Sequence, residues 1–454
     1  MSQNRCTYAG IAAFFTAYFA WFSWGFLRLR FSPDEVMNMY AYWHPALRQF
    51  LLSHLMIWQG AYRPMGGAFY LPLFYIFGWN PLPYHVVHSL VLLATVPLFF
   101  ALARQLGCDL RVSAVVALIA CYHDGLNQLY NNTAFVYDGL CGFFYFAAFA
   151  WYTRARSRGT LRWPETTAFL FLYLCALNSK EMAVTLPALL LVYEYLYFDS
   201  PSWRGVILSG LLNVPYIYGR VLAPGALATQ TMYRPVFSWD RVLDFQRNSL
   251  SDLLLAWDHM NIWVILAVWA LVTWLAWRRP RPILRFCWFW ILLTPLPIEF
   301  LDGRSQATLY IPLFGWAVFA SVILIDAVDA IAAWLPAQRR AAAAALLCAV
   351  LVVWAVANRR LQRYLPTALA QMGEQTWAVM QQMETLHPRV EPHSRVVFLN
   401  DPFEDWDMAF IADLWFRDRT VNVRLNRKTP LSPAELAGAN HVFEFENGRL
   451  VQLR

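Results

Sequence analysis

The chain has 454 residues, a formal net charge of +7, and a composition that is 59% hydrophobic and only 14% charged. That balance excludes an ordinary soluble enzyme and predicts an α-helical polytopic membrane protein. The basic residues fall in short clusters between apolar spans, which argues against a nucleic-acid partner. Neither a disulfide framework nor a zinc site is expected, because most cysteines lie inside apolar spans: Cys121, Cys141, Cys175, Cys287 and Cys348.

About 20 apolar residues suffice to cross a bilayer as a helix, and the chain contains about eleven apolar spans of roughly that kind. The first span follows Arg5 and has no small-residue cleavage site, so we interpret it as a retained helix with a cytoplasmic N-terminus. The predicted spans are 8–27, 83–103, 112–130, 133–152, 164–180, 182–199, 204–222, 259–277, 283–301, 307–329 and 340–357.

Strict alternation of these spans places every strong basic cluster on the cytoplasmic side, as the positive-inside rule requires. Arg104 and Arg111 flank one cytoplasmic loop, and Arg278 and Arg279 begin another. The short loops and the cysteine-free outer loops indicate a bacterial inner membrane, with the polar site on the periplasmic face. The outer segments are then 28–82, 123–132, 178–181, 223–258 and 299–306.

Two acidic residues, Asp34 and Glu35, follow the first span at the start of a polar loop. Ser32-Pro33-Asp34-Glu35 is also a good helix N-terminus, with acids in the first turn. The functional interpretation is a carboxylate that accepts a proton from an acceptor hydroxyl, while its neighbour orients it. Both interpretations are compatible, since a capped helix is a rigid support for a base.

The first outer loop, residues 28–82, is far longer than a usual connection and is expected to be structured. Tyr62 and Arg63 lie within it, before a proline. An arginine there either extends its side chain to the lipid headgroups or binds a specific phosphate.

Histidines mark the ends of two neighbouring spans. His85 and His88 share one helix face, where a hydrogen-bonded structural role is favoured over a metal site because no third ligand is near in sequence. His123 lies at the end of the third span, and Asp138 lies one turn inside the fourth. A carboxylate at membrane depth is a functional candidate by default.

Lys180 and Glu181 join two spans with almost no loop. They form either a local ion pair that stabilises the turn or, for Lys180, a contact to a phosphate. Arg304 adds a cation on the same outer side. Several cations beside carboxylates predict an anionic, lipid-linked substrate and catalysis by charge stabilisation.

The chain becomes more polar after the last span, and we divide it into a transmembrane domain, 1–358, and a small extracytoplasmic α/β domain, 359–454. An amphipathic helix is predicted over 359–386. Residues 394–399 and 441–445 have the composition of β-strands.

The order of these outer motifs resembles the GT-C superfamily of membrane glycosyltransferases, in particular the protein O-mannosyltransferases and their tetratricopeptide-bearing transmembrane relatives. The resemblance covers roughly residues 1–330, and the tail shows no tetratricopeptide pattern. The matching motifs are Asp34-Glu35, Tyr62-Arg63-Pro64, Tyr84-His85 with His88, His123 followed by Asp138, Lys180-Glu181, and Leu309-Tyr310-Ile311-Pro312.

The resemblance implies a GT-C-like fold and an inverting hexosyl- or pentosyltransferase that uses a polyprenyl-phosphate-linked sugar on the outer face. Asp34 would be the base, and Arg63, Lys180 and Arg304 would neutralise the departing phosphate, with Tyr62 and His123 beside the donor. Glu35, Asp138, Glu181, His85 and His88 would have positioning roles. The acceptor would be a protein or a glycan, and no metal is assigned.

Two other functions remain alternatives at this stage. An oligosaccharide ligase or polymerase would use the same kind of donor with similar electrostatics. A transporter of lipid-linked sugars predicts broken, polar helices at mid-membrane, which the apolar span centres disfavour.

Overall fold

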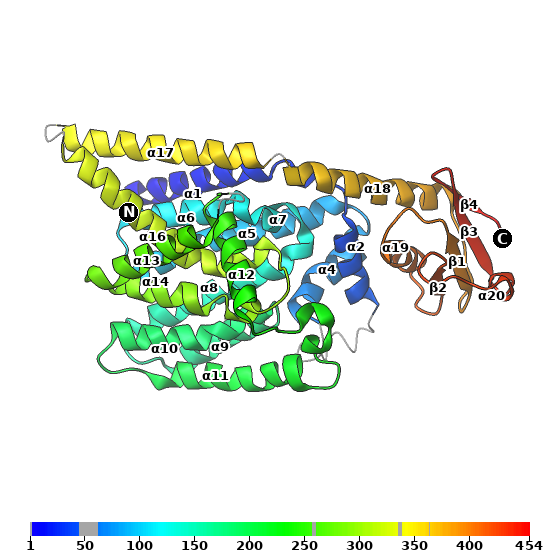
Figure 1. Cartoon of the computed structure of the whole chain (residues 1–454), viewed down its shortest axis with the longest axis horizontal. Helices are drawn as coiled ribbons and strands as arrows, with labels where there is room; N and C mark the ends of the chain where they lie inside the picture. Colours follow the sequence, from blue (N-terminus) through cyan, green and yellow to red (C-terminus); the bar gives the residue numbers. More distant parts are fainter. Residues whose placement is uncertain (1, 45–61, 257–259, 335–337, 363) are drawn as a thin grey trace.

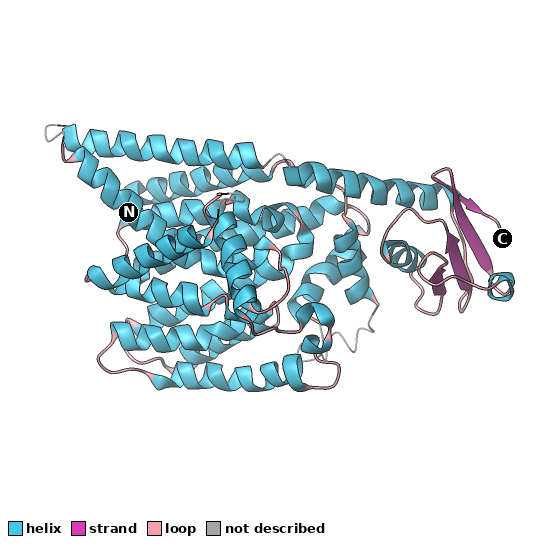
Figure 2. Cartoon of the chain, in the orientation of Figure 1, coloured by secondary structure: helices cyan, strands magenta, loops and turns pink. Residues whose placement is uncertain are grey.

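The computed structural model describes residues 2–44, 62–256, 260–334, 338–362 and 364–454, so that part of the first predicted outer loop, 45–61, lies outside the described residues. The chain forms a helical bundle with a small α/β domain at one end (Figures 1 and 2).

Each of the predicted spans contains a helix. The helices are α1 (Ser2–Ser23), α5 (Pro81–Gln105), α6 (Leu110–Cys121), α8 (Val136–Arg156), α9 (Trp163–Leu177), α10 (Leu186–Tyr197), α11 (Trp203–Ile217), α13 (Ile262–Arg278), α14 (Pro282–Leu293), α16 (Tyr310–Ala332) and α17 (Arg339–Leu361). Among the described residues, 5 stretches are long and apolar enough to cross a membrane by length and composition, and they contain α5, α8, α11, α16 and α17. The expectation of about eleven spans therefore matches the helix positions but only partly their lengths.

Helix α8 is the central helix of the bundle, and most of its spanning stretch is buried. Its aromatic residue Phe146 stacks on Trp290 of α14, and both rings contact Phe314 of α16. Gly142 lets Tyr310 approach closely, because a Cβ at that glycine would lie 2.6 Å from the tyrosine ring. The centre of the bundle is thus a fixed support for the first turn of α8, which carries Asp138.

Short elements connect the long helices at the end of the bundle nearest the C-terminal domain (Figure 1). Proline at the first helical position starts both α2 and α4, which fits its fixed φ. The elements that matter for the site are α2 (Pro33–Trp43), α4 (Pro64–Phe77), α7 (Asn127–Asn131), η4 (Glu181–Thr185), η7 (Thr231–Tyr233), α12 (Trp239–Leu253), α15 (Leu296–Glu299) and η8 (Gln306–Leu309).

The C-terminal part folds around a four-stranded sheet of order β2-β1-β3-β4, with β1 parallel to both neighbours and β3 antiparallel to β4. The two predicted strands correspond to β1 and β3. Helix α17 continues to Leu361, so the predicted division at 358/359 falls inside its last turn, and the helix expected over 359–386 begins separately. The elements are α18 (Tyr364–Leu386), β1 (Arg395–Leu399), α19 (Asp407–Phe416), β2 (Asn422–Leu425), α20 (Pro433–Ala437), β3 (His441–Glu446) and β4 (Arg449–Gln452).

Helix α19 of this domain packs against α2 (Figure 1). Met39 of α2 and Ile411 of α19 belong to one buried apolar cluster, and the rings of Tyr40 and Phe410 lie 4.7 Å apart. Helix α2 is therefore held between the bundle and the C-terminal domain.

Candidate functional site

The two acidic residues in the first turn of α2, Asp34 and Glu35, have different surroundings. Glu35 is 3% exposed and accepts hydrogen bonds from the backbone N–H and the hydroxyl of Ser32, at 2.7 and 3.0 Å, in a capping box. Asp34 is exposed and lines a cavity instead. One turn of helix thus sends the first carboxylate into the cavity and the second into the protein.

Glu35 also ties α2 to the segment before α8. Its carboxylate accepts from the backbone N–H of Thr133 at 3.0 Å and from the Thr133 hydroxyl at 2.5 Å, and His85 lies 3.5 Å away. Burial alone would raise the pKa of Glu35, but contacts with His85, Thr133 and Ser32 outweigh it and hold that pKa below its usual range. Glu35 is therefore a charged anchor for α2.

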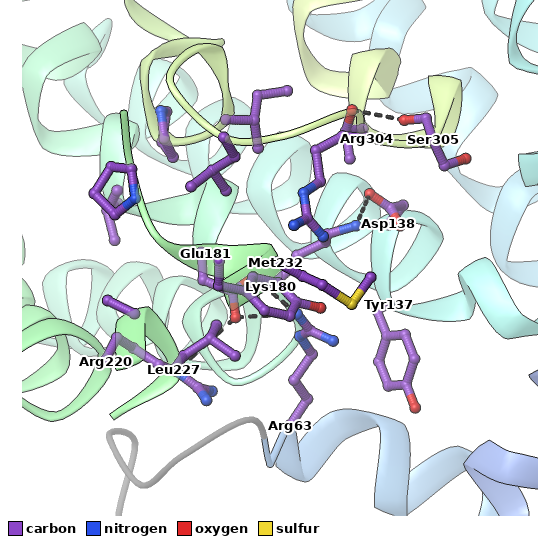
Figure 3. Close-up of a pocket in the computed structure, with 18 of the residues that line it drawn as sticks. Arg63, Tyr137, Asp138, Lys180, Glu181, Arg220, Leu227, Met232, Arg304 and Ser305 are labelled. Carbon is purple, nitrogen blue, oxygen red and sulfur yellow. Dashed lines mark hydrogen bonds and ion pairs between the residues drawn. The ribbon is translucent and has the colours of Figure 1, made fainter. Parts of the chain in front are cut away.

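The cavity holds most of the charged residues that the sequence indicates. Its volume is about 740 Å³, within the range of ligand pockets. Figure 3 shows side chains from several elements pointing into it. The predicted site residues that line it are Asp34, Arg63, Asp138, Lys180, Glu181 and Arg304. Apolar side chains complete the wall, including Ile217, Val221, Met232, Leu293 and Leu296.

Each of two predicted cations lies against a carboxylate in this cavity. The Lys180 ammonium contacts both oxygens of Asp138 at 2.6 Å, and the Asp138 side chain is 3% exposed. Arg63 donates to both oxygens of Glu181, at 3.2 and 3.1 Å. Lys180 and Glu181 therefore do not pair with each other. Each pairs with a residue distant in sequence: Asp138 in α8, and Arg63 at the N-cap of α4 (Figure 3).

Glu181 brings two guanidinium groups together. Arg220, from a later part of the chain, lies 4.0 Å from the Glu181 carboxylate. It also donates a hydrogen bond to the carbonyl oxygen of Tyr62 at 2.7 Å. Burial would raise the pKa of Glu181, yet Arg63 and Arg220 lower it to about 2. The carboxylate is ionised at neutral pH, and it fixes the two arginines side by side on the cavity wall.

Tyrosine rings support the same cations. The Arg63 guanidinium carbon lies 5.1 Å from the ring centre of Tyr137, and that of Arg304 lies 4.2 Å from the ring centre of Tyr233. Gly66 makes room for Tyr137, since a Cβ there would come within 2.2 Å of its ring. Arg63 and Arg304 hold the pKa of Tyr233 below its usual range against the effect of burial.

The environment of Asp34 disfavours its charged form. Although its side chain is accessible in the cavity, the surrounding protein partly desolvates it and raises its pKa, and the carboxylates of Glu35 and Asp405 raise it further. Asp405 belongs to the C-terminal domain, which reaches this side of the site. A carboxyl with a raised pKa is a stronger base than an ordinary aspartate once it is ionised.

Five predicted site residues are not among the described residues that line the cavity, and four of them lie close to α2 or to the arginines. Glu35 and His85 are buried in the anchor described above. His88 donates to the carbonyl of Leu129 at 2.6 Å. The backbone carbonyl oxygen of Tyr62 accepts a hydrogen bond from Arg220. These residues support the site rather than face it.

His123 is not among the described residues that line the cavity. It is 1% exposed, and its Nε2 lies 3.1 Å from the carbonyl oxygen of Leu253 at the end of α12. Burial lowers its pKa to about 4, so the ring is neutral at pH 7. In this structure His123 contacts the end of α12 and does not line the cavity, so its predicted contact with the donor phosphate stays a prediction.

The cavity residues that the sequence analysis did not indicate include Asn38, Tyr137 and Tyr233. Asn38 could have been found, because it lies one helical turn after Asp34 on the same face of the capped helix. Tyr137 precedes Asp138, and Tyr233 lies in a loop without a motif. Among the described residues, no group of three or more His, Cys, Asp or Glu side chains is arranged to hold a metal ion.

Structural comparison identifies similar membrane proteins. No protein-family model and no curated protein sequence matches the chain. Two crystal structures of ArnT from Cupriavidus metallidurans have a similar fold. The structure bound to undecaprenyl phosphate aligns with a TM-score of 0.51 and 13% identity over 92% of this chain and 86% of ArnT. The apo structure gives 0.54 and 14% over 97% and 94%. At such low identity the likeness shows that the two proteins share a fold.

Proposed function

We propose that this protein is a membrane glycosyltransferase that moves a sugar from a polyprenyl-phosphate-linked donor to an acceptor hydroxyl. The observation that carries the proposal is one cavity in which the carboxylate of Asp34 shares the walls with four cations, Arg63, Lys180, Arg220 and Arg304. Its apolar walls suit an isoprenoid chain. The ArnT structure with bound undecaprenyl phosphate supports a lipid-phosphate ligand for this fold.

The chemistry follows from the two kinds of charge. The acceptor oxygen attacks the anomeric carbon while its proton passes to Asp34, and the bond between that carbon and the phosphate oxygen breaks. The phosphodiester has one negative charge, and the departing phosphate monoester gains a second. The cations are worth most as that charge develops, so they stabilise the transition state more than the bound donor. Attack opposite the leaving phosphate makes the transfer inverting.

Several of these cations are paired with carboxylates, so part of their positive charge is already neutralised before a ligand binds. Lys180 is neutralised by Asp138, and Arg63 shares Glu181 with Arg220. Counting Arg304 and Asp34, four positive and three negative groups leave a small positive excess. That excess suits the single charge of a phosphodiester, and the paired carboxylates keep the cations fixed before the donor arrives.

We place the reaction on the periplasmic face of a bacterial inner membrane. Helix α8 begins at the cavity with Asp138 and ends with Arg154 and Arg156, so its site end and its basic end are opposite. The positive-inside rule puts the basic end in the cytoplasm. A protein or glycan hydroxyl is the proposed acceptor, and the O-mannosyltransferases are the proposed relatives within the superfamily.

The direct test is turnover of defined donors. Purified protein in lipid nanodiscs would be incubated with synthetic polyprenyl-phosphate hexoses and pentoses and with membrane extracts as the source of acceptor. We expect release of polyprenyl phosphate from at least one donor, and its loss in Asp34→Asn. Absence of binding and of turnover for every donor would refute the proposal.

A further inference from the structure

We propose that the side-chain amide of Asn38 binds a hydroxyl group of the donor sugar and thereby sets sugar preference. This inference rests on the proposed function and assigns a positioning role to a residue that no sequence motif indicates. Asn38 is half-buried, lines the cavity, and belongs to the same helix face as Asp34.

A chain of contacts crosses the cavity from the phosphate side to the base. Arg63 lies over the ring of Tyr137, 5.1 Å from its centre. The Tyr137 hydroxyl donates to Oδ1 of Asn38 at 3.0 Å. Asp34 lies one helical turn before Asn38 on α2. In the proposed donor, the sugar is attached directly to the phosphate. A sugar whose phosphate lies at Arg63 and whose anomeric carbon is reached from Asp34 must therefore lie beside Asn38.

The amino group of Asn38 has only weak partners that a ligand could replace. With Oδ1 held by Tyr137, the Nδ2 group has a 3.5 Å contact to the carbonyl oxygen of Ala134, at the limit of a hydrogen bond, and the Tyr70 hydroxyl lies on the same side. An amide nitrogen carries two hydrogens, so it can donate to a sugar oxygen without releasing Tyr137. The buried Tyr137 ring, in the space that Gly66 leaves, fixes the direction in which the amide points.

The consequence is discrimination between donors that differ in one hydroxyl. A site that hydrogen-bonds a substrate hydroxyl rejects the analogue without it, because the polar group of the site is then left unpaired. We expect the unmodified protein to prefer its sugar over the matching deoxy-sugar by about tenfold or more in kcat/KM.

The experiment measures that preference in Asn38→Ala. Polyprenyl-phosphate sugars would be supplied as matched pairs, each a parent sugar and a deoxy form, and both Kd and kcat/KM would be measured in nanodiscs. Asn38→Ala should bring the parent-to-deoxy ratio close to one for the pair that lacks the recognised hydroxyl, mainly by weakening the parent. Asn248→Ala is the matched control, because Asn248 is exposed on α12 and lines a smaller, adjoining pocket but not the main cavity. Its ratios should equal those of the unmodified protein.

Tyr137→Phe separates sugar recognition from support. If Asn38 only anchors Tyr137, then Asn38→Ala and Tyr137→Phe will slow all donors equally and leave every ratio unchanged, which would overturn the inference. Failure of the proposed function gives a different result: the unmodified protein would then bind no polyprenyl-phosphate sugar better than the free polyprenol. Unchanged ratios in a protein that turns over its donors would refute only the role of Asn38.

Discussion

Replacing Glu35 by alanine should damage the fold of the site, whereas replacing its neighbour Asp34 by asparagine should damage only the chemistry. Glu35 accepts four hydrogen bonds from two residues, Ser32 and Thr133, and lies 3.5 Å from His85. Glu35→Ala leaves those buried donors without their carboxylate. Losing one partner of a buried charged network costs about 3–5 kcal/mol, and we expect a loss of that size in the free energy of unfolding.

The pH dependence has a defined sign. The pKa of Glu35 is lowered in the folded protein, so its contribution to stability is present above the pKa of the unfolded chain, about 4.3. That contribution is lost as the pH falls through the lower folded pKa. Stability of the unmodified protein should therefore decrease on acidification in this range, and Glu35→Ala should show a weaker decrease.

Thermal unfolding in detergent, followed by tryptophan fluorescence, would measure both effects. The matched control is Glu374→Ala, because the Glu374 side chain is 67% exposed and lies 3.9 Å from Arg30; exposed ion pairs contribute little to stability. Equal melting temperatures for Glu35→Ala and Glu374→Ala would refute the anchor role. So would a loss of stability in Asp34→Asn as large as that in Glu35→Ala.

Three further results are expected. Lys180→Met leaves the Asp138 carboxylate buried without its cation and should lower the melting temperature, and the double variant with Asp138→Asn should recover part of the loss; no recovery would contradict the pairing. Asp405→Asn removes a charge that raises the pKa of Asp34, so the acid limb of the pH–rate profile should move to lower pH, and a shift to higher pH would contradict that coupling. Tyr233→Phe keeps the aromatic ring beside its arginine but removes the hydroxyl, and should slow transfer by about tenfold if that hydroxyl contacts the departing phosphate; unchanged turnover would exclude the contact.

The positions of the helices could be predicted because membrane-spanning helices need apolar runs, and the loops between them carry basic clusters. The capping sequence before Asp34 likewise predicted the start of α2, since its hydrogen bonds are local. Span lengths were less predictable. Helix α6 ends at Cys121, and the extended backbone of Tyr122 then turns the chain where hydropathy alone would have continued the helix.

The pairings inside the cavity could not be predicted, because they join residues that are far apart in sequence. Lys180 has its own neighbour Glu181 available, yet it pairs with Asp138, while Glu181 takes Arg63. The contact of His123 was equally unpredictable. Its hydrogen-bond partner is the carbonyl oxygen of Leu253 on α12, which no local pattern in the sequence indicates.

The contact between the C-terminal domain and α2 also depends on tertiary structure. The sequence indicates a small α/β domain but not where that domain packs on the helical bundle. Met408 and Ile411 are completely buried, and they belong to the apolar cluster that includes Val36 of α2. The C-terminal domain therefore packs against the helix that carries the proposed base. This contact depends on the tertiary packing of α19 on α2, which the sequence alone does not indicate.

The most direct test of the central claim separates donor binding from transfer at the same cavity. Equilibrium binding of polyprenyl phosphate and of a turned-over donor would be measured for the unmodified protein, Asp34→Asn and Arg63→Gln. The account predicts that Asp34→Asn binds both lipids normally and loses transfer by about a hundredfold or more, as expected for loss of a general base. Arg63→Gln should weaken the binding of both lipids. Normal transfer by Asp34→Asn, or unchanged lipid binding by Arg63→Gln, would contradict it.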